Sequence, residues 1–241
     1  MFDLSQDNDV EEEKDNIGGL QQLETNVYEF EVVMAYLSEA ASGAVAMNFE
    51  LKTDSGATHR ETIYITSGTA KGGKTYYIHK TTGKKHNLPG YTQVYNIVAI
   101  TLGQELRDAV KESEKKTLKL YDFKVGSEVD KEIDHVFVKM IGKRVKLGIK
   151  KIVENKTKKN ETTGKYDPIN EEREKREISV AFYPESNLTV SETKDKIEVA
   201  EFHDKWLAKW KGKEVNKFKE VKVDPSAATE KKDEGAFPGF G

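Results

Sequence analysis

The chain has 241 residues, of which 34% are charged and 36% are hydrophobic, and its formal net charge is −3. This length fits one large domain with additions. Because the chain has no cysteine, disulfides and thiolate metal sites are excluded. No apolar run approaches the roughly 20 residues of a membrane-crossing helix, and the acidic N-terminus differs from the basic start of a secretory signal. We therefore expect no membrane contact and a cytosolic protein.

The charge is unevenly distributed along the chain. Residues 1–15 hold seven acids and one lysine, and residues 224–241 hold four acids and two lysines, so the residues between them carry a net charge of +5. A basic body with acidic ends fits a protein that binds a polyanion but does not bind it indiscriminately. We expect a mostly disordered segment over residues 1–25 and a flexible tail over residues 224–241.

The first half of the chain has a clear strand pattern. Residues 27–37, 45–52 and 59–66 each alternate between apolar and polar side chains, which predicts three half-buried strands. Glycine-containing turns separate them, so we expect an antiparallel meander with one buried face and one face available to a ligand.

The remaining elements follow from period and turn signals. In chain order we expect a helix at 91–102 ended by Gly103, a short helix or loop at 105–115, a strand at 117–123, one or two helical turns at 134–141, a strand at 143–153, an exposed hairpin loop at 154–177, a strand at 178–183 and a helix from about 189 to 211. Trp206 and Trp210 fall at helical spacing, and core packing is favoured over base stacking for both.

Residues 62–104 have an unusual composition. They contain no carboxylate, five lysines and five tyrosines. Lysines attract phosphates, and tyrosine rings stack on bases whatever the base sequence. This composition predicts a face that binds single-stranded nucleic acid. A solvated basic hairpin without a ligand remains the plain alternative.

The same stretch permits a second functional interpretation. Gly68 to Thr75 matches the phosphate-binding P-loop pattern, which needs a helix directly after it. The residues after Thr75 are aromatic and β-branched, which favours a strand. A phosphate-binding enzyme that uses Lys74 therefore stays as an alternative, and so does an interaction module that meets an acidic protein.

The sequence offers little for catalysis. The five histidines form no metal-ligand spacing, and a nucleophile elbow is absent. Asp122 and Lys124 alone are too few for a nuclease site. We expect no enzymatic activity, no metal site and no cofactor.

A binding architecture accounts for more of the pattern. A five-stranded β-barrel with a helix between its strands is the OB fold, whose open face binds oligonucleotides. We expect a mainly β chain with an OB-fold barrel over residues 26–185, a C-terminal helical extension over 186–223 and disordered acidic tails. The basic hairpin and the strand at 143–153 are expected to line one groove.

Several short segments resemble the single-stranded DNA-binding proteins of podovirus-type bacteriophages. They are Arg60-Glu-Thr-Ile-Tyr-Ile, Gly72-Gly-Lys-Thr-Tyr-Tyr, Leu88-Pro-Gly-Tyr, Leu120-Tyr-Asp-Phe, Leu147-Gly-Ile and Asn155-Lys-Thr-Lys-Lys-Asn. The resemblance spans about residues 27–210. It implies one OB fold that coats unpaired DNA without sequence preference during phage replication and recombination, in the cytoplasm of the infected bacterial host. It also implies a C-terminal tail that contacts replication or transcription proteins.

Two sets of residues follow from these arguments. The expected DNA-binding residues are Arg60, Tyr64, Lys71, Lys74, Tyr76, Tyr77, Lys80, Lys84, Lys85, Tyr91, Lys143, Arg144, Lys146, Lys150, Lys156, Lys158 and Lys159. The expected partner-binding tail residues are Asp233, Glu234, Phe237 and Phe240. Two lysines precede these tail acids, which departs from the acidic tail that is usual in the family. The acidic N-terminus could share the role of the tail by competing with DNA for the basic groove.

Overall fold

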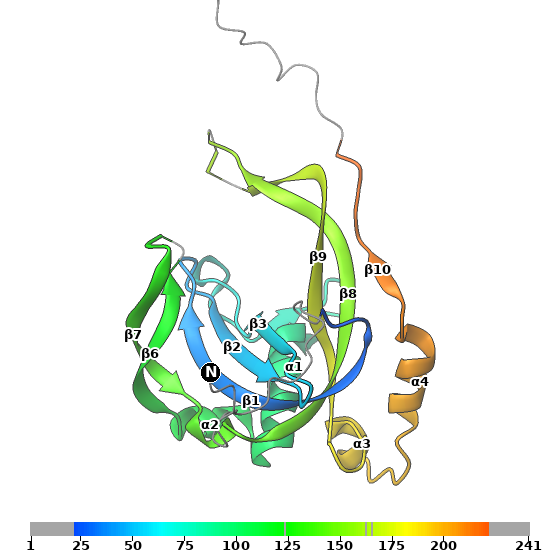
Figure 1. Cartoon of the computed structure of the whole chain (residues 1–241). Helices are drawn as coiled ribbons and strands as arrows, with labels where there is room; N and C mark the ends of the chain where they lie inside the picture. The colour runs from blue at the N-terminus through cyan, green and yellow to red at the C-terminus, as the bar shows by residue number, and fades with distance from the viewer. Residues whose placement is uncertain (1–21, 123, 162, 165, 222–241) are drawn as a thin grey trace, which may run out of the picture. The chain divides into compact units, whose positions relative to one another are not determined.

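The computed structural model describes residues 22–122, 124–161, 163–164 and 166–221 (Figure 1). The chain is mainly β, as expected, and its strands form an open antiparallel sheet. No closed barrel is found in the described part, so the OB barrel is not confirmed. Both predicted tails lie almost entirely outside the described residues. The chain divides into two compact units, one comprising Leu23 and Glu29–Val145 and the other Glu24–Tyr28 and the residues from Lys146 onward.

The first unit is built on the predicted meander. β1 (Asn26–Glu39), β2 (Val45–Lys52) and β3 (Thr58–Tyr64) pair in antiparallel order, which confirms the three strands. Tyr36 lies opposite Asn48, and Asn48 lies opposite Thr62, so one face of the meander is polar. The largest fully buried side chains of these strands are Phe30, Val32, Met47 and Leu51.

A helix follows the basic hairpin where the sequence predicts it. α1 (Pro89–Leu102) has proline in its first turn and ends at Gly103, whose φ of 68° is left-handed, as is typical of helix ends. The helix packs closely on β3, because a Cβ built on Gly90 would lie only 2.2 Å from the carbonyl oxygen of Tyr64. A short second helix, α2 (Leu106–Lys111), comes next.

The β6–β7 hairpin was only half predicted. β6 (Glu114–Asp122) confirms one strand, but its partner β7 (Ser127–Val136) was not predicted and covers the start of the region 134–141, where one or two helical turns were expected. Only a single 3-10 turn, Val138–Met140, forms there. In β7 the acids Glu128, Asp130, Glu132 and Asp134 alternate with other residues at a period of two, which is a strand pattern.

The second unit is dominated by two long paired strands. β8 (Arg144–Lys159) and β9 (Tyr166–Phe182) are antiparallel, and β10 (Glu214–Asn216) runs parallel to β8 (Figure 1). The hairpin loop expected at 154–177 is therefore wrong for most of its length. Backbone pairing needs no apolar side chains, and cross-strand ion pairs such as Arg173–Glu154 and Lys156–Glu171 accompany it.

The predicted C-terminal helix is divided in two. α3 (Val190–Lys194) and α4 (Glu201–Trp210) are separate helices. Trp206 is buried, as predicted. It packs on the backbone of β8 at Gly148, where an added Cβ would lie 2.8 Å from the indole. A glycine inside a strand here permits the close approach of a large ring.

Glu192 joins the two helices and gives a first testable prediction. Its carboxylate accepts hydrogen bonds from the backbone of Thr189 at 2.8 Å and of Phe202 at 3.0 Å. Burial raises the pKa of this carboxyl, but the hydrogen bonds from Thr189 and Phe202 outweigh it, so the pKa lies below its ordinary value of 4.5. Stability from a lowered carboxyl pKa is present above the unfolded-state pKa and is lost as the pH falls through the folded-state pKa.

We therefore expect Glu192→Ala to destabilise the second unit by about 1.5–3 kcal/mol at neutral pH. The difference from the parent chain should shrink as the pH falls below about 4.5, because protonation then weakens the parent's hydrogen bonds. Urea unfolding followed by tryptophan fluorescence measures the loss of stability at neutral pH and its change with pH, since Trp206 and Trp210 lie in this unit. A difference that stayed constant with pH would contradict the capping role.

Candidate nucleic-acid interface

The middle of the acid-free stretch folds as a separate two-stranded hairpin. β4 (Tyr76–Ile78) pairs with β5 (Lys85–Asn87), and Tyr77 lies opposite His86. The turn between them is closed by a hydrogen bond from His79 N–H to the carbonyl of Lys84, 2.8 Å long. Gly83 takes a left-handed φ of 65° in this turn, which few other residues tolerate. The predicted basic hairpin is thus confirmed as a structure.

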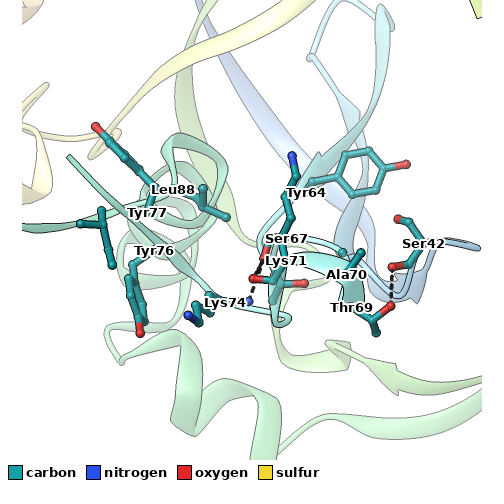
Figure 2. A pocket seen from close by; sticks show the side chains of 13 residues that line it. Ser42, Tyr64, Ser67, Thr69, Ala70, Lys71, Lys74, Tyr76, Tyr77 and Leu88 are labelled. Carbon is teal, nitrogen blue, oxygen red and sulfur yellow. Dashed lines mark hydrogen bonds between the residues drawn. The ribbon is translucent and has the colours of Figure 1, made fainter. Parts of the chain in front are cut away.

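A pocket of about 900 Å³ opens beside this hairpin (Figure 2). It lies within the first unit, and its walls come from the end of β3, the β1–β2 turn, the loop between β3 and β4, and the hairpin. The lining residues are Ser42, Tyr64, Thr66, Ser67, Gly68, Thr69, Ala70, Lys71, Lys74, Tyr76, Tyr77, Ile78 and Leu88. Among these described residues none is Asp or Glu. The pocket therefore combines aromatic surface with positive charge only.

The three tyrosines of the pocket differ in how much of each ring is accessible. Tyr64 is 53% exposed and Tyr77 is 44% exposed, whereas Tyr76 is half-buried. The ammonium groups of Lys74 and Lys85 lie 5.8 Å and 4.8 Å from the Tyr76 ring centroid. Tyr64 and Tyr77 are therefore the rings available for stacking, and Tyr76 holds two cations near them.

Neighbouring contacts fix the walls of the pocket. The Tyr77 ring stacks on His86 with centroids 5.7 Å apart. The Ser67 hydroxyl accepts a 2.9 Å hydrogen bond from Lys74 N–H, and the carbonyl of Ser42 accepts one of 2.8 Å from Thr69 N–H. Ser42, Ser67 and His86 were missing from the sequence prediction. In the sequence, the one feature that could have pointed to Ser42 is its position before Gly43 in the turn between the first two strands.

The P-loop interpretation lacks its structural context. Thr75 is followed by strand β4, so the helix that the pattern needs directly after the loop is missing. Loop amides that a phosphate would need already donate within the protein. Lys71 N–H bonds to Gly68, Gly72 N–H to Thr69 and Gly73 N–H to Gly68. The loop does not form the phosphate cradle that the pattern requires.

The other predicted residues of the first unit fall into two places. Lys80, Lys84 and Lys85 are exposed on the hairpin beside the pocket. Tyr91 is half-buried on α1 and stacks on Tyr95 with centroids 6.5 Å apart. Arg60 lies in a different groove of about 400 Å³ that also contains three carboxylates, and it pairs with Glu50 at 2.9 Å. Arg60 is therefore not part of the acid-free pocket.

The cations predicted on the late strand are divided between the two units. Lys143 is exposed in the first unit. Arg144, also in the first unit, donates to Asp54 at 2.7 Å and to Glu29 at 2.6 Å, and these bonds raise the pKa of its guanidinium. In the second unit Lys146 donates to the carbonyl of Pro184. Arg144 and Lys146 are thus engaged in internal contacts, and the structure does not describe the expected common groove.

The remaining predicted residues lie on the long β8–β9 arm or beyond the described chain. Lys156 pairs with Glu171 at 2.9 Å, and Lys158 and Lys159 are exposed at the end of β8. Asp233, Glu234, Phe237 and Phe240 lie outside the described residues. The arm therefore presents the positive charges of Lys158 and Lys159 in the second unit. The role of the tail residues stays a prediction.

No cluster of three or more His, Asp or Glu side chains suited to hold a metal ion occurs in the described part of the chain. Within that part, no helix has the length and apolar character to cross a membrane. No family model, no curated protein and no solved structure matches this chain, so the geometry of the pocket carries the functional argument.

Proposed function

We propose that this protein binds single-stranded DNA without sequence preference and has no catalytic role. The observation that carries the proposal is the pocket beside the hairpin. Its described lining has two lysines and three tyrosines but no carboxylate. Exposed rings stack on any base, at about 1–3 kcal/mol per base, while lysines neutralise the phosphates on either side. Neither contact reads a base edge, so this recognition is independent of sequence.

The order of elements along the chain supports the finer proposal of an OB-type fold. A three-stranded meander is followed by helix α1 and later by two antiparallel strands, β8 and β9. OB folds bind oligonucleotides on their second and third strands and on the loop between the first two. Tyr64 on β3 and Ser42 between β1 and β2 both line the pocket. We further propose a role in phage DNA replication and recombination, with the C-terminal tail contacting protein partners.

Binding to a dT oligonucleotide and to duplex DNA at two salt concentrations tests the proposal. We expect the single strand to bind more tightly than the duplex, because paired bases present no accessible face to Tyr64 and Tyr77. The logarithm of the affinity should fall with the logarithm of the salt concentration by about 0.7 per phosphate contact. Equal affinity for both DNA forms, or no affinity for either, would refute the proposal.

The P-loop alternative is tested on the same protein. We expect no hydrolysis of ATP with Mg²⁺ above the buffer rate, since the helix and the unoccupied loop amides that such a site needs are missing around residues 68–75. Hydrolysis that disappeared in Lys74→Ala would favour the enzyme instead.

A further inference from the structure

The end of α4 collects positive charge that the hairpin proposal does not use. Lys150 on β8 places its ammonium group 3.5 Å from the centroid of the Trp210 ring, and Lys209 places its own 5.1 Å from the same centroid. Lys217, which follows β10, is close enough to Lys150 to affect its pKa. We call Trp210 with these three lysines the Trp210 lysine cluster. All four residues belong to the second unit.

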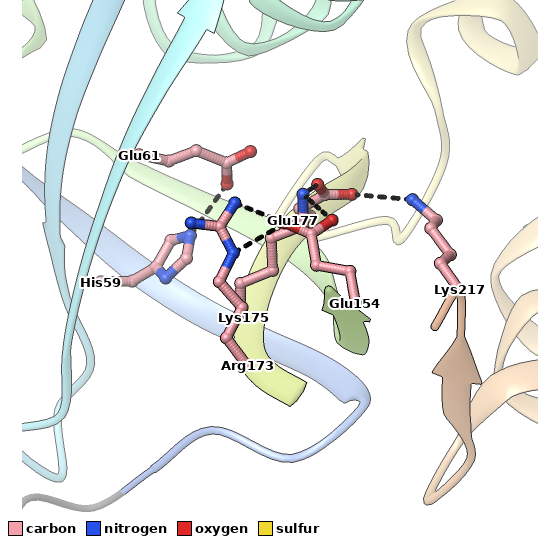
Figure 3. A network of polar contacts seen from close by, with 7 residues as sticks. All are labelled: His59, Glu61, Glu154, Arg173, Lys175, Glu177 and Lys217. Atoms are coloured by element: carbon pink, nitrogen blue, oxygen red, sulfur yellow. Dashed lines mark hydrogen bonds and ion pairs between the residues drawn. The ribbon is translucent and has the colours of Figure 1, made fainter. Parts of the chain in front are cut away.

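The carboxylates near the cluster are shared with cations outside it. Glu177 lies opposite Lys150 in the β8–β9 ladder. Its carboxylate contacts Lys175 at 2.5 Å and Lys217 at 3.6 Å (Figure 3). Glu154 pairs with Lys175 and with Arg173 (Figure 3). Glu177 is therefore divided between Lys175 and Lys217 beside Lys150, and Glu154 is taken up by Lys175 and Arg173. Lys209 adds a further positive charge near the Trp210 ring.

This excess of like charge is unfavourable in the protein alone. Burial lowers the pKa of Lys150, and the positive charges of Lys209 and Lys217 lower it further, while Glu177 acts in the opposite direction. An anion placed among these ammonium groups would relieve the repulsion. Because the ring of Trp210 already carries Lys150 at 3.5 Å, the cluster suits phosphate oxygens better than a stacked base.

We infer that the Trp210 lysine cluster is a second contact for the sugar–phosphate backbone of single-stranded nucleic acid. Its preference for a phosphate anion rests on the cluster itself. The identification of that anion as nucleic acid rests on the proposed function. The hairpin pocket supplies stacking, and the cluster supplies charge neutralisation without stacking.

The two tryptophans of the chain allow a direct test. In a Trp206→Phe chain Trp210 is the sole tryptophan, and its emission reports on the cluster. We expect that emission to change on titration with a dT oligonucleotide and also with inorganic pyrophosphate. If Trp206→Phe does not fold, the difference between the unchanged chain and Trp210→Phe gives the same signal.

The matching binding experiment uses a double variant and a charge-matched control. Lys209→Ala with Lys217→Ala should lower the salt slope of dT binding by about 1.4, since each lost phosphate contact accounts for about 0.7. Lys194→Ala with Lys205→Ala removes two charges elsewhere in the second unit, where Lys205 pairs with Glu201 at 2.6 Å. We expect this control to keep the slope of the parent chain.

The outcomes separate this inference from the proposed function. If dT binds but Trp210 emission is constant and the Lys209/Lys217 variant keeps the parent slope, the inference is wrong and the hairpin proposal stands. If dT does not bind, the hairpin proposal is wrong. The pyrophosphate titration alone then tests whether the Trp210 lysine cluster binds an anion. A pyrophosphate response that is lost in the double variant supports the anion site, and the absence of any response overturns it.

Discussion

Replacing Tyr64 and Tyr77 together with alanine is expected to weaken binding to a dT oligonucleotide roughly 30-fold or more. The two rings are the exposed aromatic surface of the acid-free pocket. Each stacked base contributes about 1–3 kcal/mol, and 1.4 kcal/mol corresponds to a tenfold change in affinity. The measurement is a fluorescence titration at two salt concentrations. The salt slope should change little, because the lysines remain.

Two controls make the tyrosine result specific. Tyr64→Phe with Tyr77→Phe keeps both rings and should retain most of the affinity. Tyr121→Ala removes a ring of the same 53% exposure as Tyr64, but one that lines the carboxylate-containing groove, and it should have a small effect. Unchanged affinity in the Tyr64/Tyr77 alanine variant would show that the pocket does not stack bases.

Gly90→Ala should lower both the stability of the first unit and its affinity for single strands. The added Cβ would lie 2.2 Å from the Tyr64 carbonyl oxygen and 3.0 Å from Ile63 Cγ2. A backbone atom cannot move aside as a side-chain end can, so α1 and β3 must separate. Overpacking of this kind costs about 1–3 kcal/mol, occasionally more. Because Tyr64 sits on the displaced segment of β3, the pocket should be disturbed as well.

Urea unfolding and dT titration of the same preparation measure both effects of Gly90→Ala. Thr92→Ala is the matched control, since Thr92 is exposed on the same helix and its truncation adds no atom toward β3. A Gly90→Ala chain with parental stability and affinity would contradict the close packing of α1 on β3.

The sequence predicts those parts of the fold whose signals are local. The meander, the hairpin and α1 each follow from a pattern within a few residues, such as the glycine turns or Pro89 and Gly103 at the ends of the helix. The long arm was missed because its strands carry charged side chains, and their pairing depends on partners across the ladder, such as Arg173 with Glu154. An apolar-periodicity argument does not detect such strands.

The site was predictable in composition but not in its partners. The lysines and tyrosines of the hairpin are visible as an acid-free run. Arg144, in contrast, looks available in the sequence, yet Glu29 and Asp54 engage it across 115 and 90 residues of chain. Ser42 enters the pocket by a contact with Thr69, which lies 27 residues away in the sequence. Such pairings depend on tertiary structure and are not visible in the composition. The prediction from composition therefore placed too many cations in one groove.

Photo-crosslinking tests most directly whether the hairpin pocket holds unpaired nucleotides. A dT oligonucleotide carrying 5-iodouracil is irradiated with the full-length protein, and the crosslinked peptides are identified by mass spectrometry. We expect crosslinks at Tyr64 or Tyr77. A duplex competitor should not abolish them, whereas an excess of unlabelled dT should. Crosslinks found solely outside residues 62–91, with the hairpin peptides recovered unmodified, would contradict this expectation.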